Sequence, residues 1–201
     1  MRRPFLLRRA VHQAGYDPGM SEDVNEPPKA VVEGYDPPPF FFAQTSPHGA
    51  VRWVAWTGKL PQLKQLVYGL LRLFSPHAQV LLKVDKKDVS DGAVWTRYHG
   101  EAPVAKVVHA IRDHERLIFQ DGYTQLCVRD DDTGEYIALD EYGVLYIYAH
   151  DDRFTQTCRD CGFEERPETL ISDQPHWRQA LDDAAELRAS LVKALHLEEV
   201  E

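Results

Sequence analysis

The sequence has few cysteines and no long apolar run. Its 201 residues include only three cysteines, an odd number that is too small for a disulfide framework. No apolar run approaches the ~18 residues that a membrane helix needs, and no secretory apolar segment precedes the cysteines. We therefore expect a chain that does not span a bilayer and that resides in a reducing cytoplasm.

The sequence also lacks the short motifs that mark common catalytic sites. It contains no Walker loop, no GxSxG elbow, no GxGxxG turn and no HExxH pair. Catalytic residues can converge from distant positions, so a small hydrolase or transferase stays open as an alternative. Such an enzyme would need a pocket that gathers Arg97, His99 or His176 with acidic residues. The sequence favours a binding protein without enzymatic activity.

Lysine and asparagine are scarce, and the charge is unevenly distributed. Fifteen arginines stand against eight lysines, and Asn25 is the only asparagine, a bias typical of a GC-rich, bacterial genome. The net charge of the whole chain is −9. Four arginines and one aspartate give residues 1–19 a charge of +3, so residues 20–201 carry −12. An acidic body repels nucleic acid and favours basic partners, although acidity also serves solubility alone.

Two stretches of unusual composition precede the first strong structural pattern. Residues 1–19 are basic, and the composition changes abruptly at Met20. The two interpretations are a translation start at Met20, which would make residues 1–19 an artefact, and a targeting segment. Residues 20–39 combine five prolines with several acids, which is typical of an extended chain. We expect a flexible N-terminal segment over residues 1–39 and a single domain over residues 40–201.

The domain is organised around residues 122–149, where apolar and polar positions alternate in three runs. Strict alternation predicts strands with one buried face. Residues 131–134 and 140–143 each begin with Asp and end with Gly, which indicates two tight hairpin turns and a three-stranded meander. The predicted buried face carries Leu126, Val128, Ile137, Leu139, Leu145 and Ile147. The opposite face is predicted to carry four tyrosines, Tyr123, Tyr136, Tyr146 and Tyr148, together with Gln125, Cys127, Ala138 and Val144.

Four further strands and two helices are predicted before the meander. Residues 40–42 and 51–57 form one hairpin, and a helix begins near Pro61. Residues 80–84 and 93–99 form a second hairpin around Asp91-Gly92, and another helix runs from Pro103 through Ile118.

Two helices are predicted after the meander. The first is short and ends at Cys158. The second is long and is capped by Ser172 or Asp173. It is predicted to turn inward Trp177, Leu181, Ala184, Leu187, Leu191 and Leu195. The order of elements favours an α+β fold with a mainly antiparallel sheet, helices packed on one side and a C-terminal helix.

The segment Cys158-Arg159-Asp160-Cys161-Gly162 is the strongest candidate for a metal site. Two thiolates at this spacing resemble one knuckle of a zinc ribbon, but a closed site needs four ligands. The only other cysteine, Cys127, lies in the meander, so His150 or His176 would have to complete the set. The same letters suit the end of a helix, with both cysteines on one face and Gly162 just after it. We predict the helix end and no cofactor, with a zinc-binding regulatory or adaptor domain as the alternative.

The most acidic part of the chain surrounds the two meander turns. Residues 130–135 have a superficial likeness to a calcium loop, but the alternating flanks predict a hairpin turn. We predict a surface where carboxylates steer a basic partner and tyrosines supply rigid contact area. The predicted partner-binding residues are Asp130, Asp131, Asp132, Glu135, Tyr136, Asp140, Glu141, Tyr146 and Tyr148.

In its general organisation the whole chain resembles the acidic α+β immunity proteins of bacterial polymorphic toxin systems. The shared features are size, an acidic body, strands that carry tyrosine and tryptophan, and no catalytic motif. The CRDCG element at residues 158–162 is similar to the CxxCG motifs of some immunity families. The resemblance implies a cytoplasmic inhibitor that binds one cognate toxin, often a basic nuclease. It implies a protein partner, no nucleic acid, no membrane and no catalytic residue.

Overall fold

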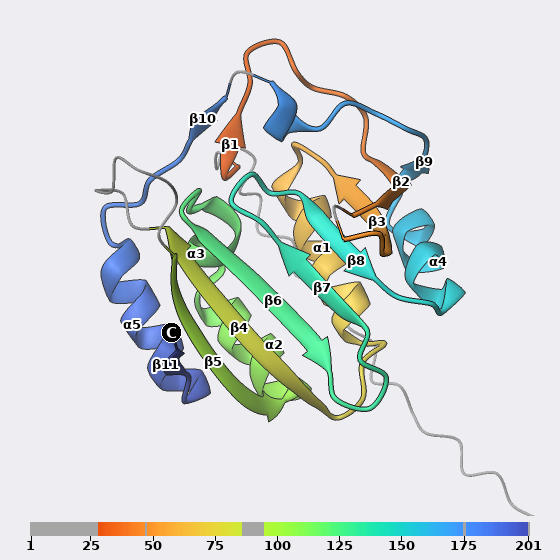
Figure 1. Cartoon of the computed structure of the whole chain (residues 1–201). Helices are drawn as coiled ribbons and strands as arrows, with labels where there is room; N and C mark the ends of the chain where they lie inside the picture. The colour runs from red at the N-terminus through yellow and green to blue at the C-terminus, as the bar shows by residue number, and fades with distance from the viewer. Residues whose placement is uncertain (1–27, 47, 86–94, 175, 201) are drawn as a thin grey trace, which may run out of the picture.

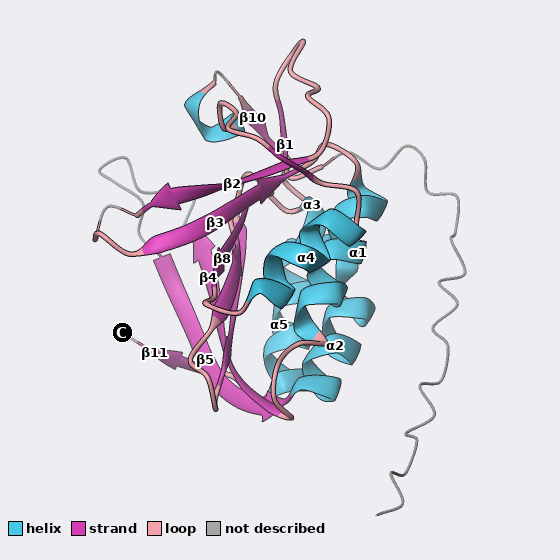
Figure 2. Cartoon of the chain, turned by 90° about the vertical axis from the view of Figure 1, so that its right-hand side faces the viewer, coloured by secondary structure: helices cyan, strands magenta, loops and turns pink. Residues whose placement is uncertain are grey.

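Alternating apolar side chains build one large sheet, and the described α-helices lie on one side of it. The computed structural model describes residues 28–46, 48–85, 95–174 and 176–200. Figure 1 looks onto the outer face of the sheet, and Figure 2 shows the described α-helices together on the inner face. The predicted α+β fold with a mainly antiparallel sheet is confirmed.

The sheet runs in the order β11-β5-β4-β6-β7-β8-β3-β2-β9, and only the pairing of β2 with β9 is parallel. Its strands are β2 Phe40–Thr45, β3 Val51–Trp56, β4 His77–Asp85, β5 Trp95–Pro103, β6 Thr124–Asp130, β7 Tyr136–Leu139, β8 Leu145–Tyr148, β9 Glu164–Glu165 and β11 Glu198–Val200. The helices are α1 Leu60–Leu71, α2 Val104–Asp113, α3 Glu115–Gln120, α4 Asp152–Asp160 and α5 Ala184–Leu195.

The meander predicted from the sequence is confirmed as β6, β7 and β8. Leu126 pairs with Leu139, which pairs with Leu145, and the neighbouring row of inward residues has the same register. All six residues of the predicted buried face are at most 4% exposed. Both turn glycines have positive φ, 72° at Gly134 and 78° at Gly143, which residues with a side chain rarely adopt.

The main core lies between the inner face of the sheet and the helices. Helices α1, α2, α3 and α4 contribute apolar side chains that are almost entirely buried, such as Leu66, Ile111, Phe119 and Phe154. Each such side chain stabilises the fold by about 1.5–3 kcal/mol relative to exposure. Because burial on the inner side is nearly complete, this face is occupied by the protein itself.

The helix predicted over residues 103–118 is two helices. The chain leaves helical geometry at His114, where φ is −125° and ψ is 29°, and α3 begins at the next residue. The His114 ring is buried, and its Nδ1 lies 2.7 Å from the carbonyl oxygen of Ala110. No proline or glycine marks this break, so the apolar spacing continues across it and conceals it.

The prediction of a long helix from Ser172 or Asp173 is wrong over the first half of that segment. A 3-10 turn at Ile171–Asp173 is followed by β10 Trp177–Arg178, and helix α5 begins only at Ala184. Trp177, which was predicted to face inward, is 81% exposed. It instead pairs with Val31, because β10 forms a two-stranded ribbon with β1 Ala30–Val31. Such a pairing between distant residues leaves no periodic signal in either segment.

Residues 28–39, which the sequence analysis assigned to the flexible segment, pack against the outer face of the sheet. Lys29 is fully buried and Ala30 is 1% exposed. Together with Leu170 and Ile171, they cover a second, smaller apolar cluster on this face, centred on Phe40, Val54, Trp56 and Val144. The ribbon therefore covers one end of the outer face, as Figure 1 shows.

The helix end predicted at Cys158–Gly162 is confirmed. Asp151 caps α4 by accepting a hydrogen bond from the backbone N–H of Arg153 at 2.8 Å. Gly162 has a φ of 79°, and the backbone N–H of Phe163 donates to the carbonyl of Cys158 at 3.0 Å. This is the pattern of a glycine-terminated helix with an apolar residue after it.

The predicted Asp91-Gly92 turn lies outside the described residues. The hairpin it belongs to is present, because β4 and β5 pair from His77 with Pro103 to Asp85 with Trp95. Within the described ranges, every helix is too short or too polar to cross a membrane.

We predict that Gly122→Ala loosens the ribbon from the sheet. A Cβ atom at this position would lie 2.7 Å from the Lys29 carbonyl oxygen and 2.8 Å from the Arg178 Cβ, both of which are closer than real contacts allow. We expect a loss of about 1–3 kcal/mol in the free energy of unfolding, measured by urea denaturation.

Gly58→Ala is the matched control, since its Cβ would meet the side chains of Trp56 and Asp36 at ordinary distances of 3.4 and 3.6 Å. A Gly122→Ala protein as stable as the Gly58→Ala protein would contradict close packing of the ribbon.

Candidate protein-binding face

Three tyrosines and one arginine form a cluster on the outer face of the meander. Tyr136 and Tyr148 stack with ring centroids 4.2 Å apart and an angle of 15° between their planes. The Arg52 guanidinium lies 4.1 Å from the centroid of Tyr146 and donates to the Tyr148 hydroxyl at 3.0 Å. We call Arg52, Tyr136, Tyr146 and Tyr148 the Tyr–Arg cluster.

Strand register places these four residues together. Tyr136 pairs with Tyr148, and Val54 pairs with Tyr146, which sets Arg52 beside Tyr148. Gln44 on β2 accepts from the Arg52 Nη2 at 2.6 Å and from its Nε at 3.0 Å. The guanidinium is therefore held on two sides, while the rings on its third side are half-buried.

Beside this cluster, Lys29 is buried among three carboxylates. Its ammonium donates to the Thr124 carbonyl beneath the ribbon. Burial lowers the pKa of Lys29 to about 8, although Asp140 and Asp121 act in the opposite direction. Asp121 is held in turn by the Thr124 hydroxyl at 2.6 Å. We call Lys29, Asp121, Asp140 and Glu141 the Lys29 cluster.

Asp140 connects the Lys29 cluster to the Tyr–Arg cluster. Its Oδ1 accepts the backbone N–H groups of Tyr142 at 2.9 Å and Val144 at 2.8 Å, which closes the second meander turn. Burial, and next the charge of Glu141, raise the pKa of Asp140 to about 7. The Tyr146 hydroxyl bonds the same carboxylate, and burial raises the pKa of Tyr146, which keeps this phenol neutral.

The structure separates the nine predicted partner-binding residues into two groups. Tyr136, Tyr146 and Tyr148 come together as predicted. Several carboxylates are instead engaged within the chain. Asp130 is 1% exposed and accepts the backbone N–H groups of Asp132 at 2.8 Å and of Thr133 at 2.9 Å.

Burial opposes ionisation of Asp130, but the backbone donors, including that of Ser75, prevail and lower its pKa. Glu135 accepts the backbone N–H groups of His150 at 3.0 Å and Asp151 at 3.2 Å. Glu141 accepts from the Gln125 amide. Asp131 and Asp132 are the exposed carboxylates of the first turn.

Two residues of this candidate face, Arg52 and Lys29, were missed from the sequence. The alternation of residues 51–56 places Arg52 on the outer side with Val54 and Trp56, so its strand face was predictable but its neighbours were not. Lys29 gave no signal, because it lies in a proline-rich stretch that predicts extended chain.

The cysteines are not gathered into one site. Cys158 is buried in the main core, where burial raises the pKa of its thiol to about 12, and burial also raises the pKa of Cys161. Cys127 lies on the outer face of β6, with the sheet between it and Cys158. Among the described residues no group of three or more His, Cys, Asp or Glu side chains is placed to hold a metal ion.

The residues considered for an enzyme site are also apart. Arg97 and His99 lie on β5, whereas His176 packs edge-on against Tyr142, in the turn that joins β7 and β8, with centroids 4.6 Å apart. Strands β4 and β6 lie between β5 and β7 in the sheet.

Three comparisons with known proteins were made, and none finds a relative of this chain. A scan against models of protein families, a search of curated proteins and a search of solved structures each return no match. The outer face is therefore the basis for the functional argument, and its chemistry is that of a preorganised, amphipathic contact surface.

We predict that Asp140 makes stability fall as pH rises toward neutrality. Its pKa is raised in the folded state to about 7, so its contribution to stability is fully present below pH 3.8 and is lost as pH rises through 7. In Asp140→Asn this dependence disappears. The difference in unfolding free energy between wild type and variant should therefore fall with pH between 5 and 6.5, by at most about 1.4 kcal/mol per unit.

Urea denaturation at several pH values measures this difference. Asp131→Asn, which alters an exposed carboxylate of the other turn, should give a difference that is flat over the same range. A flat difference for Asp140→Asn as well would show that Asp140 is ionised in the folded state throughout.

Proposed function

We propose that this protein is a non-enzymatic binding protein whose outer sheet face engages a protein partner, in the manner of an immunity protein that neutralises a basic toxin in the cytoplasm of the producing cell. The observation that carries the proposal is the Tyr–Arg cluster. It lies on the side of the sheet opposite the α-helices, next to the ribbon-covered end.

The cluster has the chemistry of a contact surface whose side chains would lose little conformational entropy when a partner binds. Tyrosine and arginine are the residue types that most often dominate binding energy in protein interfaces. Here Arg52 is stacked over Tyr146 and held by Gln44, so little side-chain freedom remains to be lost on binding. The phenol rings offer apolar area, while Arg52 supplies directed hydrogen bonds.

The net negative charge of the whole protein favours a basic partner. The predicted carboxylates account for only part of that charge. Asp130 and Asp140 serve the meander turns, so their role in the proposal is to hold the face in shape. Asp131 and Asp132 stay in solvent at its rim. A net charge of −9 attracts a basic protein over roughly the Debye length, about 8–10 Å at physiological salt.

The test begins with a tagged pull-down from the native host at low and high salt, followed by mass spectrometry. We expect one basic protein, retained less as the salt concentration rises. The purified pair is then used to measure binding by surface plasmon resonance and inhibition of the partner's activity.

We predict that Tyr148→Ala weakens this binding by roughly 30-fold or more, mainly through faster dissociation, because it removes an aromatic anchor and the acceptor of Arg52. Tyr98→Ala is the matched control, since Tyr98 is also a half-buried strand tyrosine but faces the opposite side of the sheet. Equal losses in the two variants, at equal folded stability, would contradict the proposed face.

A second pair of variants locates the electrostatic effect. Asp131→Asn with Asp132→Asn should lower the association rate several-fold at low salt, because both carboxylates rim the face. Asp182→Asn with Glu186→Gln removes the same charge near α5, from residues that are also exposed. Slower association only in the second pair would place the interface near α5.

A further inference from the structure

The ribbon formed by β1 and β10 turns an apolar pair toward solvent. Trp177 is 81% exposed and Val31 is 46% exposed, whereas the neighbouring Ala30 is 1% exposed. Val31 and Trp177 are direct partners in the antiparallel pairing, so their side chains lie together on one face of the ribbon. Trp177 is the most exposed large apolar side chain in the part of the chain that the structure describes. We call these two residues the Trp177 pair.

The backbone that carries the Trp177 pair is fixed to the sheet. The backbone N–H of Gly122 donates to the Gln179 carbonyl oxygen at 2.7 Å, which links the end of β10 to the loop before β6. Arg178, the residue after Trp177, forms an ion pair with Asp85 at 2.9 Å. Because its support is rigid, a partner that binds Trp177 orders only the indole side chain itself. Tryptophan is among the residue types that most often dominate binding energy in protein interfaces.

The surface around the Trp177 pair is acidic. The described parts of residues 28–36 and 171–178 contain three exposed ionisable residues, all within five positions of the pair, which are Glu33, Asp36 and Asp173. The lysine and the arginine of these segments do not offset them, because Lys29 is fully buried and Arg178 is paired with Asp85. A partner that is complementary to this surface has an apolar pocket with basic side chains around it.

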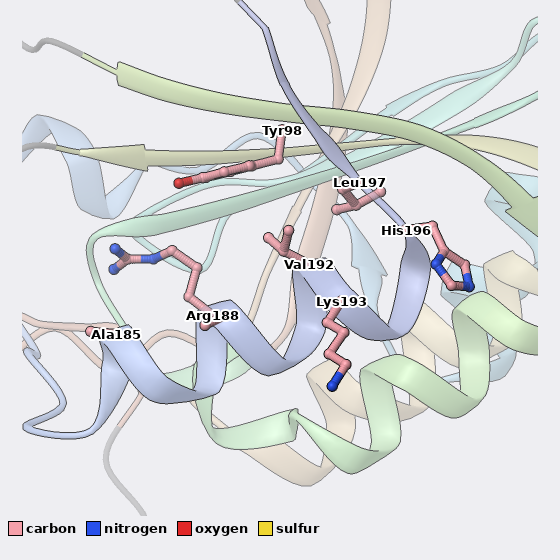
Figure 3. A pocket seen from close by; sticks show the side chains of 8 residues that line it. Tyr98, Ala185, Arg188, Val192, Lys193, His196 and Leu197 are labelled. Atoms are coloured by element: carbon pink, nitrogen blue, oxygen red, sulfur yellow. The ribbon is translucent and has the colours of Figure 1, made fainter.

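The hollow beside helix α5 has the opposite character. This open hollow of about 460 Å³ lies between α5 and the Tyr98 side chain on β5. Figure 3 shows Arg188 and Lys193 on α5 and His196 at the end of the helix, all of which line the hollow. Positively charged side chains oppose the approach of a basic protein, so the acidic surroundings of the Trp177 pair suit such a partner better.

The Trp177 pair adjoins the Tyr–Arg cluster through the second meander turn. His176, the residue before Trp177, packs edge-on against Tyr142 in that turn, with ring centroids 4.6 Å apart. Asp140 in the same turn bonds the hydroxyl of Tyr146, which belongs to the cluster. A stable protein interface buries about 800 Å² on each partner, which is more area than the four side chains of the cluster offer. We therefore expect a partner seated on the Tyr–Arg cluster to extend onto an adjoining anchor.

We propose that the Trp177 pair belongs to the surface that binds the protein partner, and that this partner is a basic protein that receives Trp177 in an apolar pocket. The inference rests on the proposed function and adds a second contact to it. The pocket encloses the indole ring, and basic side chains at its rim face the acidic residues beside the pair.

Two measurements on the full chain and its purified partner test the proposal. In hydroxyl-radical footprinting, oxidation of Trp177 should fall roughly tenfold or more in the complex, because the centre of an interface excludes water. In surface plasmon resonance, Trp177→Ala should weaken binding roughly 30-fold or more. Since Trp177 is exposed in the free protein, this variant should unfold in urea as the wild type does.

Two valine substitutions provide a matched comparison. Val31→Ala should weaken binding roughly threefold, because it removes part of the apolar contact. Val200→Ala makes the same change at a residue that is 41% exposed, on the edge strand β11 away from the ribbon (Figure 1), and should leave binding unchanged. This comparison does not depend on how Trp177→Ala affects the ribbon.

The outcomes separate this inference from the proposed function. Weaker binding of Tyr148→Ala with unchanged binding of Trp177→Ala would overturn the inference and leave the Tyr–Arg cluster as the binding face. The reverse result would contradict the Tyr–Arg cluster and support the Trp177 pair. Equal binding of Val31→Ala and Val200→Ala, or unchanged oxidation of Trp177 in the complex, would also overturn the inference. Recovery of no basic partner would overturn both proposals.

Discussion

The α-helices of this structure bury one face of the sheet. The other face must therefore be covered by other segments or remain in contact with solvent. Apolar residues at every second position of β4, β6, β7 and β8 form a nearly water-free inner layer with the helices. The same alternation turns mixed polar and aromatic residues outward. The protein covers one end of this outer face with the β1–β10 ribbon and leaves the neighbouring tyrosines half-buried.

Covering the outer face brought a charge into the interior. The ribbon carries Lys29 onto the sheet, where it loses its water and gains the Thr124 carbonyl and nearby carboxylates. A charge buried in this way contributes little net stability, because its desolvation offsets the attraction of nearby opposite charges. The hydrogen bond from Lys29 to the Thr124 carbonyl links the ribbon to β6. Asp140 accepts from the backbone of its own turn and bonds the Tyr146 hydroxyl.

The Tyr–Arg cluster is a row of neighbouring positions on paired strands, so it is rigid and shallow. A surface of that shape suits a protein partner.

Short sequence patterns were sufficient to predict those parts of the fold that are formed by residues close together in the chain. Alternation and the Asp and Gly positions of its turns predicted the meander, and Gly162 predicted the end of α4. The three tyrosines were assigned to the correct face for the same reason. A helix break without proline or glycine, at His114, could not be read from spacing that continues across it.

Only the tertiary structure decided which residues meet over long distances. The pairing of Ala30 with Arg178 turned half of a predicted helix into a ribbon and exposed Trp177. It also brought the buried Lys29 ammonium near Asp140, which was predicted to be a surface carboxylate. The amino-acid sequence by itself determined the spacing of apolar residues in each segment, and with it most of the strands and helices. That spacing depends only on residues that are close together along the chain. The environment of each charge depends on contacts between distant segments, and no local pattern encodes those.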